Sequence, residues 1–330
     1  MIGVLVLTGP GLGELRTRLA DASAGWLCAG VAFEVLSALA YVVILRAVFC
    51  PSMGWRMSYQ IGMSEQGANS VFSVSGVGGL ALGAWALHRG GMSTAQIGRK
   101  SVAFFFLTSL ANVASVILFA ALYLTGTFHG DPDPALTYGF GAAAALATAL
   151  VLALPAWLRT SASEGSASAR PGRIAAVRRF ARCSLAEGVR DAVELLRIRS
   201  PGVLIGSFGT MGFDLAVLGV CFLAVGYAPP LGVLALGYLI GQLGGNLPLP
   251  GGIGGLDFGL VGTFVLYGQP LAASAAAVLL YHVILLWVPG LLGSVAFLQL
   301  RRTLQRHDRP AVLCMPLAEP IQTGLRRQAA

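Results

Sequence analysis

Long apolar runs alternate with short polar loops along most of this 330-residue chain. About 20 consecutive apolar residues are needed for a helix to cross the hydrocarbon core of a bilayer. The pattern therefore predicts an all-α integral membrane protein. Five runs are long enough to form full transmembrane helices: Trp26–Phe49, Ser101–Gly126, Leu136–Leu158, Pro201–Gly226 and Leu271–Leu300.

Two further apolar regions are interrupted near their middles. Met57–Leu87 is broken at "SVSGVGG", and Leu231–Tyr267 is broken at "PLPGGIGG". Each region is too long for one straight span and carries helix-breaking residues where a span would need to continue. The pattern favours two re-entrant helical hairpins, each made of two half-helices, and leaves two very short full spans as the alternative.

Composition agrees with a bilayer location. Apolar residues make up 56% of the chain and charged residues 11%, whereas about a quarter of the residues in a typical soluble domain are charged. The cysteines form no Cys/His cluster, so no metal site is predicted. The chain contains no GxxxxGK[ST] phosphate-binding motif, and no cofactor or catalytic residue is predicted from any other pattern.

The net charge of +8 is distributed as in an oriented membrane protein. The loop from Arg159 to Arg199 carries nine arginines against four acids, and the tail after Leu300 carries six arginines. Basic loops stay in the cytoplasm, so both segments are predicted to be cytoplasmic in a multi-pass protein of the cell membrane. Because the arginines lie between hydrophobic spans and not along one amphipathic face, a nucleic-acid partner is not predicted.

A topology of five full spans and two re-entrant hairpins agrees with this distribution of charge. In that topology 20 of the 22 basic residues are cytoplasmic and the acidic "HGDPDP" loop is external. The basic helix predicted after the flexible "RTSASEGSASARPGR" linker either lies along the anionic inner leaflet or is an ordinary solvated helix. The predicted segments are 1–25, a truncated-looking N-terminal segment; 26–158, a first membrane repeat plus a linking helix; 159–200, the basic loop; 201–300, a second membrane repeat; and 301–330, the basic tail.

The two broken regions look like copies of one another. "NSVFSVSGVGGLALGAWALHRGGMS" begins at Asn69, and "NLPLPGGIGGLDFGLVGTFVLYGQP" begins at Asn246. Both run from an asparagine through a break into "GVGGL" or "GIGGL" and then through an apolar half-helix. Since the first would enter from the cytoplasm and the second from outside, the halves form an inverted repeat. Inverted repeats with broken helices are typical of secondary transporters, whose binding sites lie near the midplane.

The second break has the chemistry of a binding site. Pro250 cannot donate a backbone hydrogen bond, and the glycines after it allow a tight reversal and the close approach of another group. A break in hydrocarbon survives where it is buried in protein or lines a polar cavity. The half-helix that starts near Gly255 would point its positive end into the membrane, where a phosphate is favoured.

The "LPLPGGIGGLD" element, the apolar half-helix, "YGQP" and the long closing span together resemble the transmembrane region of lysylphosphatidylglycerol synthases, a flippase-like family. The resemblance covers roughly Trp26 to Arg302 and implies movement of aminoacylated phosphatidylglycerol between leaflets. Nothing resembles the soluble aminoacyl transferase domain of the fused synthases. The positions that match the family motif are Pro250, Gly251, Gly252 and Gly254.

Three positions differ from the pattern of that family. Asp257 stands where Glu is usual, His282 stands where Arg is common in the closing span, and Ser75 stands where the first hairpin commonly has Pro. The first membrane helix expected of the family is reduced to residues 1–9.

Four acids lie within apolar segments: Glu34, Glu65, Asp214 and Asp257. An unpaired charge at the centre of a membrane helix costs about 2.5 to 3.5 kcal/mol, so each acid needs compensation. Glu65 and Asp214 either line a polar cavity or make a structural hydrogen bond. Asp257 either caps the second half-helix or contacts a substrate, and the two roles can coexist.

Three other polar residues complete the candidate site. His282 is either a proton carrier or headgroup ligand, or a structural histidine. Asn69 and Asn246 precede the breaks and either bond the loosened backbone or contact the substrate. Gly237, Gly241 and Gly245 form a stripe that predicts close helix packing within the chain.

The sequence thus predicts a flippase-like protein that binds a phospholipid or lipid-linked headgroup at the broken helices and moves it between leaflets. Two alternatives stay open. One is a non-catalytic membrane subunit of an envelope lipid or glycan synthesis complex, with a partner protein. The other is a membrane-embedded lipid-modifying enzyme with Asp257 and His282 as acid and base.

Overall fold

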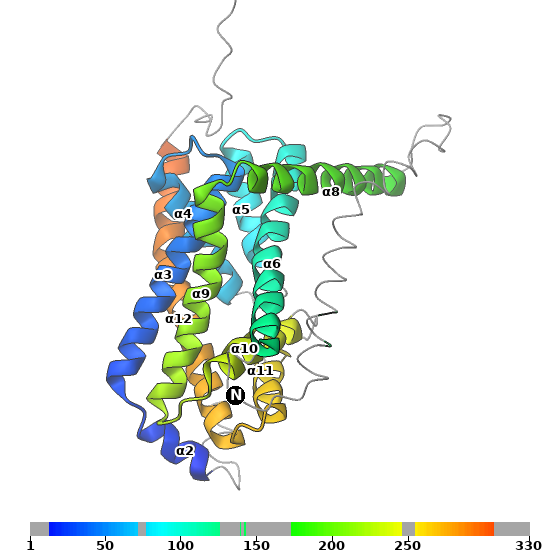
Figure 1. Cartoon of the computed structure of the whole chain (residues 1–330). Coiled ribbons are helices and arrows are strands. Elements are labelled where there is room, and N and C mark those ends of the chain that lie inside the picture. Colours follow the sequence, from blue (N-terminus) through cyan, green and yellow to red (C-terminus); the bar gives the residue numbers. More distant parts are fainter. Residues whose placement is uncertain are drawn as a thin grey trace, which may run out of the picture.

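The computed structural model describes residues 13–71, 77–125, 139, 142, 173–245 and 255–306. These residues form ten helices (Figure 1). The helices are α2 (Gly13–Ala20), α3 (Ala24–Phe49), α4 (Trp55–Val71), α5 (Val77–Arg89), α6 (Thr94–Leu124), α8 (Arg173–Arg197), α9 (Pro201–Ala224), α10 (Leu231–Gly245), α11 (Gly255–Leu266) and α12 (Leu271–Arg306).

Four of the helices, α3, α6, α9 and α12, are long and apolar enough to cross a membrane. They correspond to four of the five full spans that the sequence predicts. The fifth predicted span, Leu136–Leu158, lies outside the described residues apart from Gly139 and Ala142. The chain is therefore an all-α, multi-pass membrane protein.

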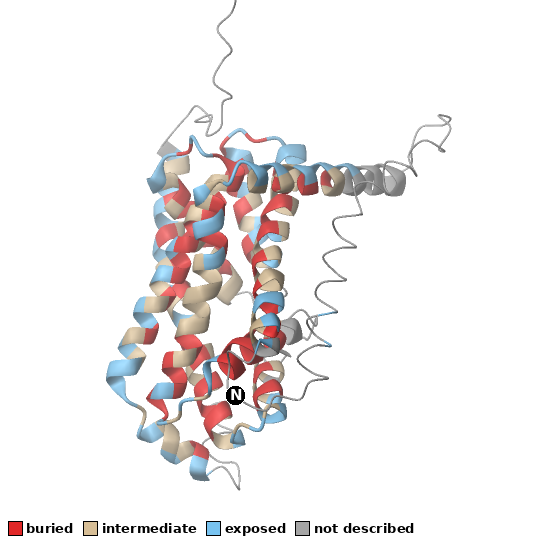
Figure 2. Ribbon diagram, in the orientation of Figure 1, coloured by how far each residue is buried: buried red, intermediate tan, exposed pale blue. Residues whose placement is uncertain are grey.

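Large apolar side chains on the outer faces of these helices agree with a lipid surround. Phe105, Ile205, Trp287 and Leu291 are each more than half exposed. In Figure 2 the buried residues lie on the inward faces of the long helices, and most exposed residues lie on the outward faces. A contiguous apolar exterior of this kind is stable in hydrocarbon and costly in water.

The helices α3 and α9 pack against each other through small residues. A Cβ atom on Gly206 would lie 2.5 Å from Cβ of Ile44, and one on Gly202 would lie 3.0 Å from Cβ of Ala47. Glycine at these positions lets the two backbones approach closely, as small residues do between membrane helices. The α9 helix ends where Gly226 takes a positive φ of 72°.

Helix α8 lies across one end of the bundle and projects beyond it (Figure 1). It is joined to the start of α6 by ion pairs, in which Oδ2 of Asp191 lies 3.0 Å from Nε of Arg99 and 3.5 Å from Nζ of Lys100. The predicted basic helix is thus confirmed as a helix. The polar contacts with α8 also explain why α6 begins at Thr94, seven residues before the predicted apolar span, where Ser93 and Gln96 form a capping box.

The two interrupted regions each form a pair of helices, α4/α5 and α10/α11. In Figure 1 the first pair lies in the half of the bundle that carries α8, and the second pair lies at the opposite end. The second half-helix begins at Gly255, as the sequence predicts. The helix α2 was not predicted, because its eight residues contain only three apolar side chains other than glycine and one i,i+4 pair, Arg18 with Glu14.

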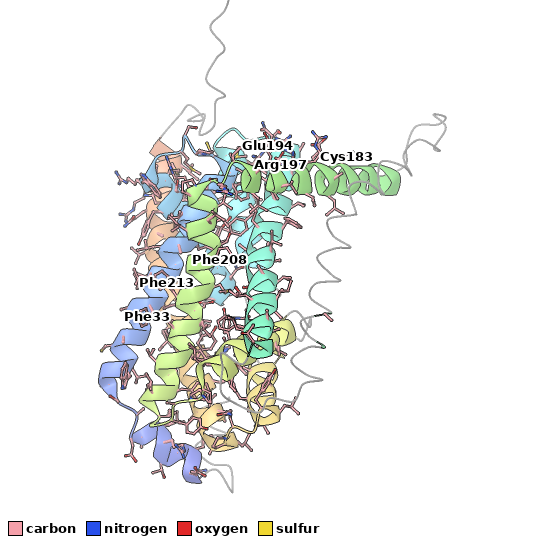
Figure 3. The ribbon with its side chains drawn as sticks, viewed as in Figure 1. Phe33, Cys183, Glu194, Arg197, Phe208 and Phe213 are labelled. Atoms are coloured by element: carbon pink, nitrogen blue, oxygen red, sulfur yellow. The ribbon has the colours of Figure 1, made fainter. Side chains whose placement is uncertain are left out.

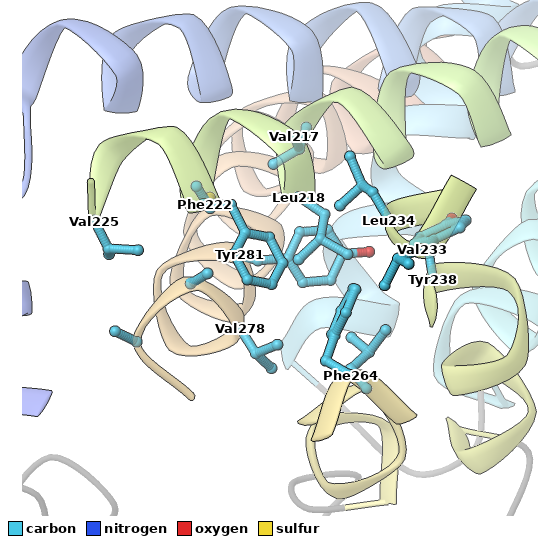
Figure 4. Packing of buried hydrophobic residues seen from close by; sticks show 14 of the residues in the cluster. Val217, Leu218, Phe222, Val225, Val233, Leu234, Tyr238, Phe264, Val278 and Tyr281 are labelled. Atoms are coloured by element: carbon cyan, nitrogen blue, oxygen red, sulfur yellow. The ribbon is translucent and has the colours of Figure 1, made fainter. Parts of the chain in front are cut away.

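An apolar core holds the second pair against the long helices (Figure 4). The ring of Phe264 on α11 meets the ring of Phe222 on α9 edge to face, with centroids 4.9 Å apart. Tyr281 of α12 is fully buried in the same cluster. Gly237 and Gly241 of α10 lie against Phe264 and Leu260 of α11, which confirms close packing within the chain at these two positions of the predicted stripe.

Candidate functional site

A cavity of about 330 Å³ lies between α3, α4, α9 and α12. Glu34 and Asp214 lie near the middles of α3 and α9, so the cavity lies about halfway along these helices. Next to these acids in the sequence, Phe33 and Phe213 stack with centroids 6.3 Å apart (Figure 3). The lining residues are Glu34, Ser37, Tyr41, Gln66, Asn69, Ser70, Thr210, Asp214, His282, Leu285, Leu286 and Pro289.

Asp214 is held by hydroxyl donors on both carboxylate oxygens. The Ser37 hydroxyl donates to Oδ1 at 3.1 Å, and the Tyr238 hydroxyl donates to Oδ2 at 3.2 Å. The donors come from α3 and α10, so three helices meet at this carboxylate. Such hydrogen bonds stabilise a partly buried carboxylate and offset part of the cost of removing its charge from water.

Glu34 shares the cavity with Asp214 but has fewer partners. Its side chain is 4% exposed, and its Oε2 atom accepts no hydrogen bond from the residues that the structure describes. A buried polar atom without a partner costs about 1 to 3 kcal/mol, and more when it is charged. Glu34 is therefore the acid of the cavity with unused binding capacity.

Glu65 lies behind the cavity wall. Its Oε2 atom accepts a hydrogen bond of 2.9 Å from the hydroxyl of Tyr41, and Tyr41 itself lines the cavity. A Cβ atom on Gly83 of α5 would overlap the Glu65 carboxylate, so Gly83 leaves the space that this side chain fills. The structure thus favours the structural hydrogen bond over direct lining for Glu65.

Asn69 joins the two helices of the first pair. Its Oδ1 atom accepts a hydrogen bond of 2.8 Å from the backbone N–H of Gly79 in the first turn of α5. The first N–H groups of a helix have no partner within the helix, so the amide satisfies one of them. Asn69 also lines the cavity, which makes the backbone role and contact with a bound group compatible.

His282 and Asp257 link the closing helix to the second pair. Nδ1 of His282 lies 3.0 Å from Oδ1 of Asp257, and both side chains are mostly buried. Asp257 is in the first turn of α11, which confirms its position at the start of that half-helix and agrees with the capping role. Because His282 also lines the cavity, Asp257 is connected to the cavity through the imidazole.

The structure brings together Asp214, His282 and Asn69 at one cavity, with Glu65 and Asp257 one contact further away. The remaining predicted site residues, Asn246, Pro250, Gly251, Gly252 and Gly254, lie outside the described residues. Among the described parts of the chain, no group of three or more His, Cys, Asp or Glu could hold a metal ion.

Sequence reasoning missed Ser37, Tyr41, Gln66 and Tyr238. A usable signal existed for two of them, because Glu34, Ser37 and Tyr41 are spaced three and four residues apart and therefore share a helix face. Tyr238 gave no signal, since a tyrosine in an apolar run is also typical of a core position.

Comparison with known proteins adds one match. No curated protein and no solved structure matches the chain. Residues 1–293 match the family described as the lysylphosphatidylglycerol synthase TM region, as the sequence motif suggested, and the chain therefore belongs to that family of membrane proteins.

Proposed function

We propose that this membrane protein is flippase-like and moves a lipid or lipid-linked headgroup between leaflets. The observation that carries the proposal is the polar cavity inside a bundle of apolar helices. Polar and ionisable groups within a membrane bundle mark substrate or ion pathways, because their burial is costly. A cavity lined by two acids, a histidine and an asparagine suits a polar headgroup whose lipid tails stay in the bilayer.

The proposed topology has about five full spans and two opposed re-entrant hairpins, α4/α5 and α10/α11, in an inverted repeat. The position of the two pairs at opposite ends of the bundle supports it (Figure 1). The proposed segments are residues 26–158 and 201–300 for the two membrane repeats. The long basic loop, 159–200, and the tail, 301–330, are placed in the cytoplasm of a cell-membrane protein on the basis of their arginines.

The proposed headgroup site combines an anion-binding and a cation-binding part. The start of α11 and the preceding residues Asn246, Pro250, Gly251, Gly252 and Gly254 suit a phosphate. Asp257, Asp214 and Glu65 supply negative charge around it, and His282 and Asn69 supply hydrogen bonds. A headgroup with both a phosphate and an amine, such as an aminoacylated phosphatidylglycerol, fits this combination.

The test is lipid translocation by purified protein in phosphatidylcholine vesicles that contain lysylphosphatidylglycerol. An amine reagent that cannot cross the membrane measures the lipid in the outer leaflet over time. Leu286→Trp enlarges a side chain that lines the cavity and is expected to slow translocation at least tenfold. Leu291→Trp is the matched control on the same helix, because Leu291 is 61% exposed and does not line the cavity.

Equal rates in the two variants would contradict a pathway through the cavity. If the pure protein moves no lipid and a partner protein restores movement, the subunit alternative replaces the transporter. Chemical conversion of the lipid by the pure protein would instead favour the enzyme alternative.

A further inference from the structure

The two acids of the cavity pose a charge problem that the lining residues do not solve. Glu34 is buried, Asp214 is partly buried, and their carboxyl groups interact electrostatically. Two like charges in one site of low dielectric constant are unfavourable unless a positive charge or a proton is also present. The problem is sharpest at Glu34, whose Oε2 atom accepts no hydrogen bond from the described residues.

The groups that face Glu34 offer no permanent positive charge. Asp214 comes from α9, Tyr238 from α10, and Tyr281 and His282 from α12. On α3 itself Tyr41 is the neighbouring titratable group, and its hydroxyl already donates to Glu65 of α4. The cation nearest to the pair among these groups is His282 when protonated, and it is engaged with Asp257 at 3.0 Å.

The basic residues of α6 are also occupied elsewhere. Arg99 and Lys100 lie at the end of the bundle that carries α8, where they pair with Asp191. The α3 helix has one basic residue, Arg46, and its guanidinium donates to the carbonyl of Met53 at 2.7 Å near the same end. These three basic residues therefore do not neutralise the acid pair.

We propose that Glu34 and Asp214 form a proton-exchange site, and that one proton crosses the membrane through it for each headgroup moved. This inference rests on the proposed lipid translocation. The two acids have different surroundings, which assigns them different roles. Asp214 has both oxygens engaged by hydroxyl donors and stays a carboxylate, whereas the free oxygen of Glu34 accepts the proton.

The proton step balances in bonds and in electrons. Water that enters the cavity from one side of the membrane delivers a proton, and an O–H bond forms on the Glu34 carboxylate. That bond breaks when the proton leaves to water on the other side, and no electrons are gained or lost. The proton gradient would in this way supply the energy for directional transport by a chain that has no GxxxxGK[ST] nucleotide-binding motif.

The first experiment measures how a pH gradient changes the final distribution of lysylphosphatidylglycerol between the leaflets. Vesicles contain the purified full chain, and potassium with valinomycin holds the membrane potential at zero. If one proton accompanies each lipid, one pH unit shifts the ratio of lipid between the leaflets about tenfold at equilibrium. Glu34→Gln cannot take up the proton, so its final ratio is expected to be independent of the gradient.

The second experiment detects the proton on Glu34 without any transport. Infrared difference spectra between acid and alkaline pH are expected to show a carboxylic acid C=O band in the wild type that is absent in Glu34→Gln. Asp214→Asn is expected to keep the band, because Glu34 still carries the exchangeable proton. Glu194→Gln, an exposed acid on α8, is the control that leaves the band unchanged. Gel filtration establishes that each variant is folded.

The outcomes separate the proton site from the translocation that it serves. If the wild type moves lipid but its final ratio does not depend on the pH gradient, proton coupling is wrong and the proposed translocation is retained. An unchanged infrared band in Glu34→Gln would overturn the assignment of the proton to Glu34. No lipid movement at all would overturn the proposed function, and the infrared titration would then still decide whether Glu34 exchanges a proton.

Discussion

The two helix pairs carry different chemistry near the start of their second helices. In the first pair, the neutral amide of Asn69 accepts the N–H of Gly79 at the start of α5. In the second pair, the start of α11 carries a carboxylate, Asp257, which lies 3.0 Å from Nδ1 of His282 on α12. The amide satisfies the backbone without charge. The carboxylate adds a charge whose partner is a cavity residue.

The two pairs also pack differently. The α4 helix buries polar side chains, including Ser58, Gln60 and Ser64, and is pressed against α12 where Gly67 meets Gly293. The α10/α11 pair is apolar and packs through glycine against rings, as Gly237 does against Phe264. The first pair is therefore anchored to the closing helix, α12, by backbone contact. The second pair is joined to it by side chains, of which one contact can change with protonation.

The largest expected effect comes from breaking the backbone anchor of the first pair. A Cβ atom on Gly293 would overlap the carbonyl of Met63 and lie 2.5 Å from Cα of Gly67. Backbone atoms cannot rotate away, so Gly293→Val is expected to abolish recovery of folded protein by gel filtration after detergent extraction. Gly262→Val is the control in the second pair, since nothing lies within 4 Å of a Cβ at that position. Normal folding of Gly293→Val would refute the anchor.

The next largest effect concerns the charged contact of the second pair. Asp257→Asn keeps the size and capping ability of the side chain, so folding is expected to be retained. Translocation is expected to fall at least tenfold, since the amide can neither hold a charged imidazole nor attract a cationic headgroup. His282→Gln is expected to slow translocation by a similar factor. The double variant should be no slower than either single variant, because paired residues act as a unit. Additive losses would show that the two residues act separately.

A smaller effect is expected at the neutral cap of the first pair. Asn69→Ala leaves the N–H of Gly79 without its acceptor, which is expected to cost about 1 to 3 kcal/mol in the free energy of unfolding. Asn69→Asp supplies an equivalent acceptor and should recover most of that loss, as measured by thermal unfolding in detergent. Equal stability of the alanine variant and the wild type would mean that the hydrogen bond contributes nothing.

The smallest effect concerns ring packing in the second pair. A Cβ on Gly237 would lie 2.5 Å from Cε1 of Phe264, so Gly237→Ala forces the ring to shift. Overpacking of this kind costs about 1 to 3 kcal/mol, and the better helix propensity of alanine returns up to about 1 kcal/mol. We expect a small net loss of thermal stability. In Gly262→Ala, with open space, the propensity gain should appear alone. A gain of equal size in both variants would contradict the close packing.

Much of the fold could be predicted because membrane helices leave a strong pattern. The starts of α9 at Pro201, of α11 at Gly255 and of α12 at Leu271 all coincide with changes in the composition of the sequence. The start of α6 was missed by seven residues, because its first turns are polar and are stabilised by α8 and not by lipid. Such tertiary contacts leave no local signal.

The candidate site was predictable in its charges but not in its geometry. Asp214 and His282 stand out as ionisable residues in apolar runs, since their burial must be compensated. Glu34 carries the same signal, yet its free oxygen becomes visible only when the helices are assembled. The contact of the Tyr238 hydroxyl with Asp214 could not be predicted from the sequence either, because it depends on how α10 packs against α9.

Cysteine labelling of the residues that flank each pair tests the opposed arrangement most directly. Single cysteines in a Cys-free background replace Ser52 and Ala95, which flank α4/α5, and Ala228 and Leu271, which flank α10/α11; all four positions are exposed. A reagent that cannot cross the membrane is applied to intact cells and to inverted vesicles. Ser52→Cys and Ala95→Cys are expected to react only from the cytoplasmic side, and Ala228→Cys and Leu271→Cys only from outside. Labelling of Ser52→Cys and Ala95→Cys from opposite sides would contradict the opposed arrangement, because α4/α5 would then cross the membrane as two short spans.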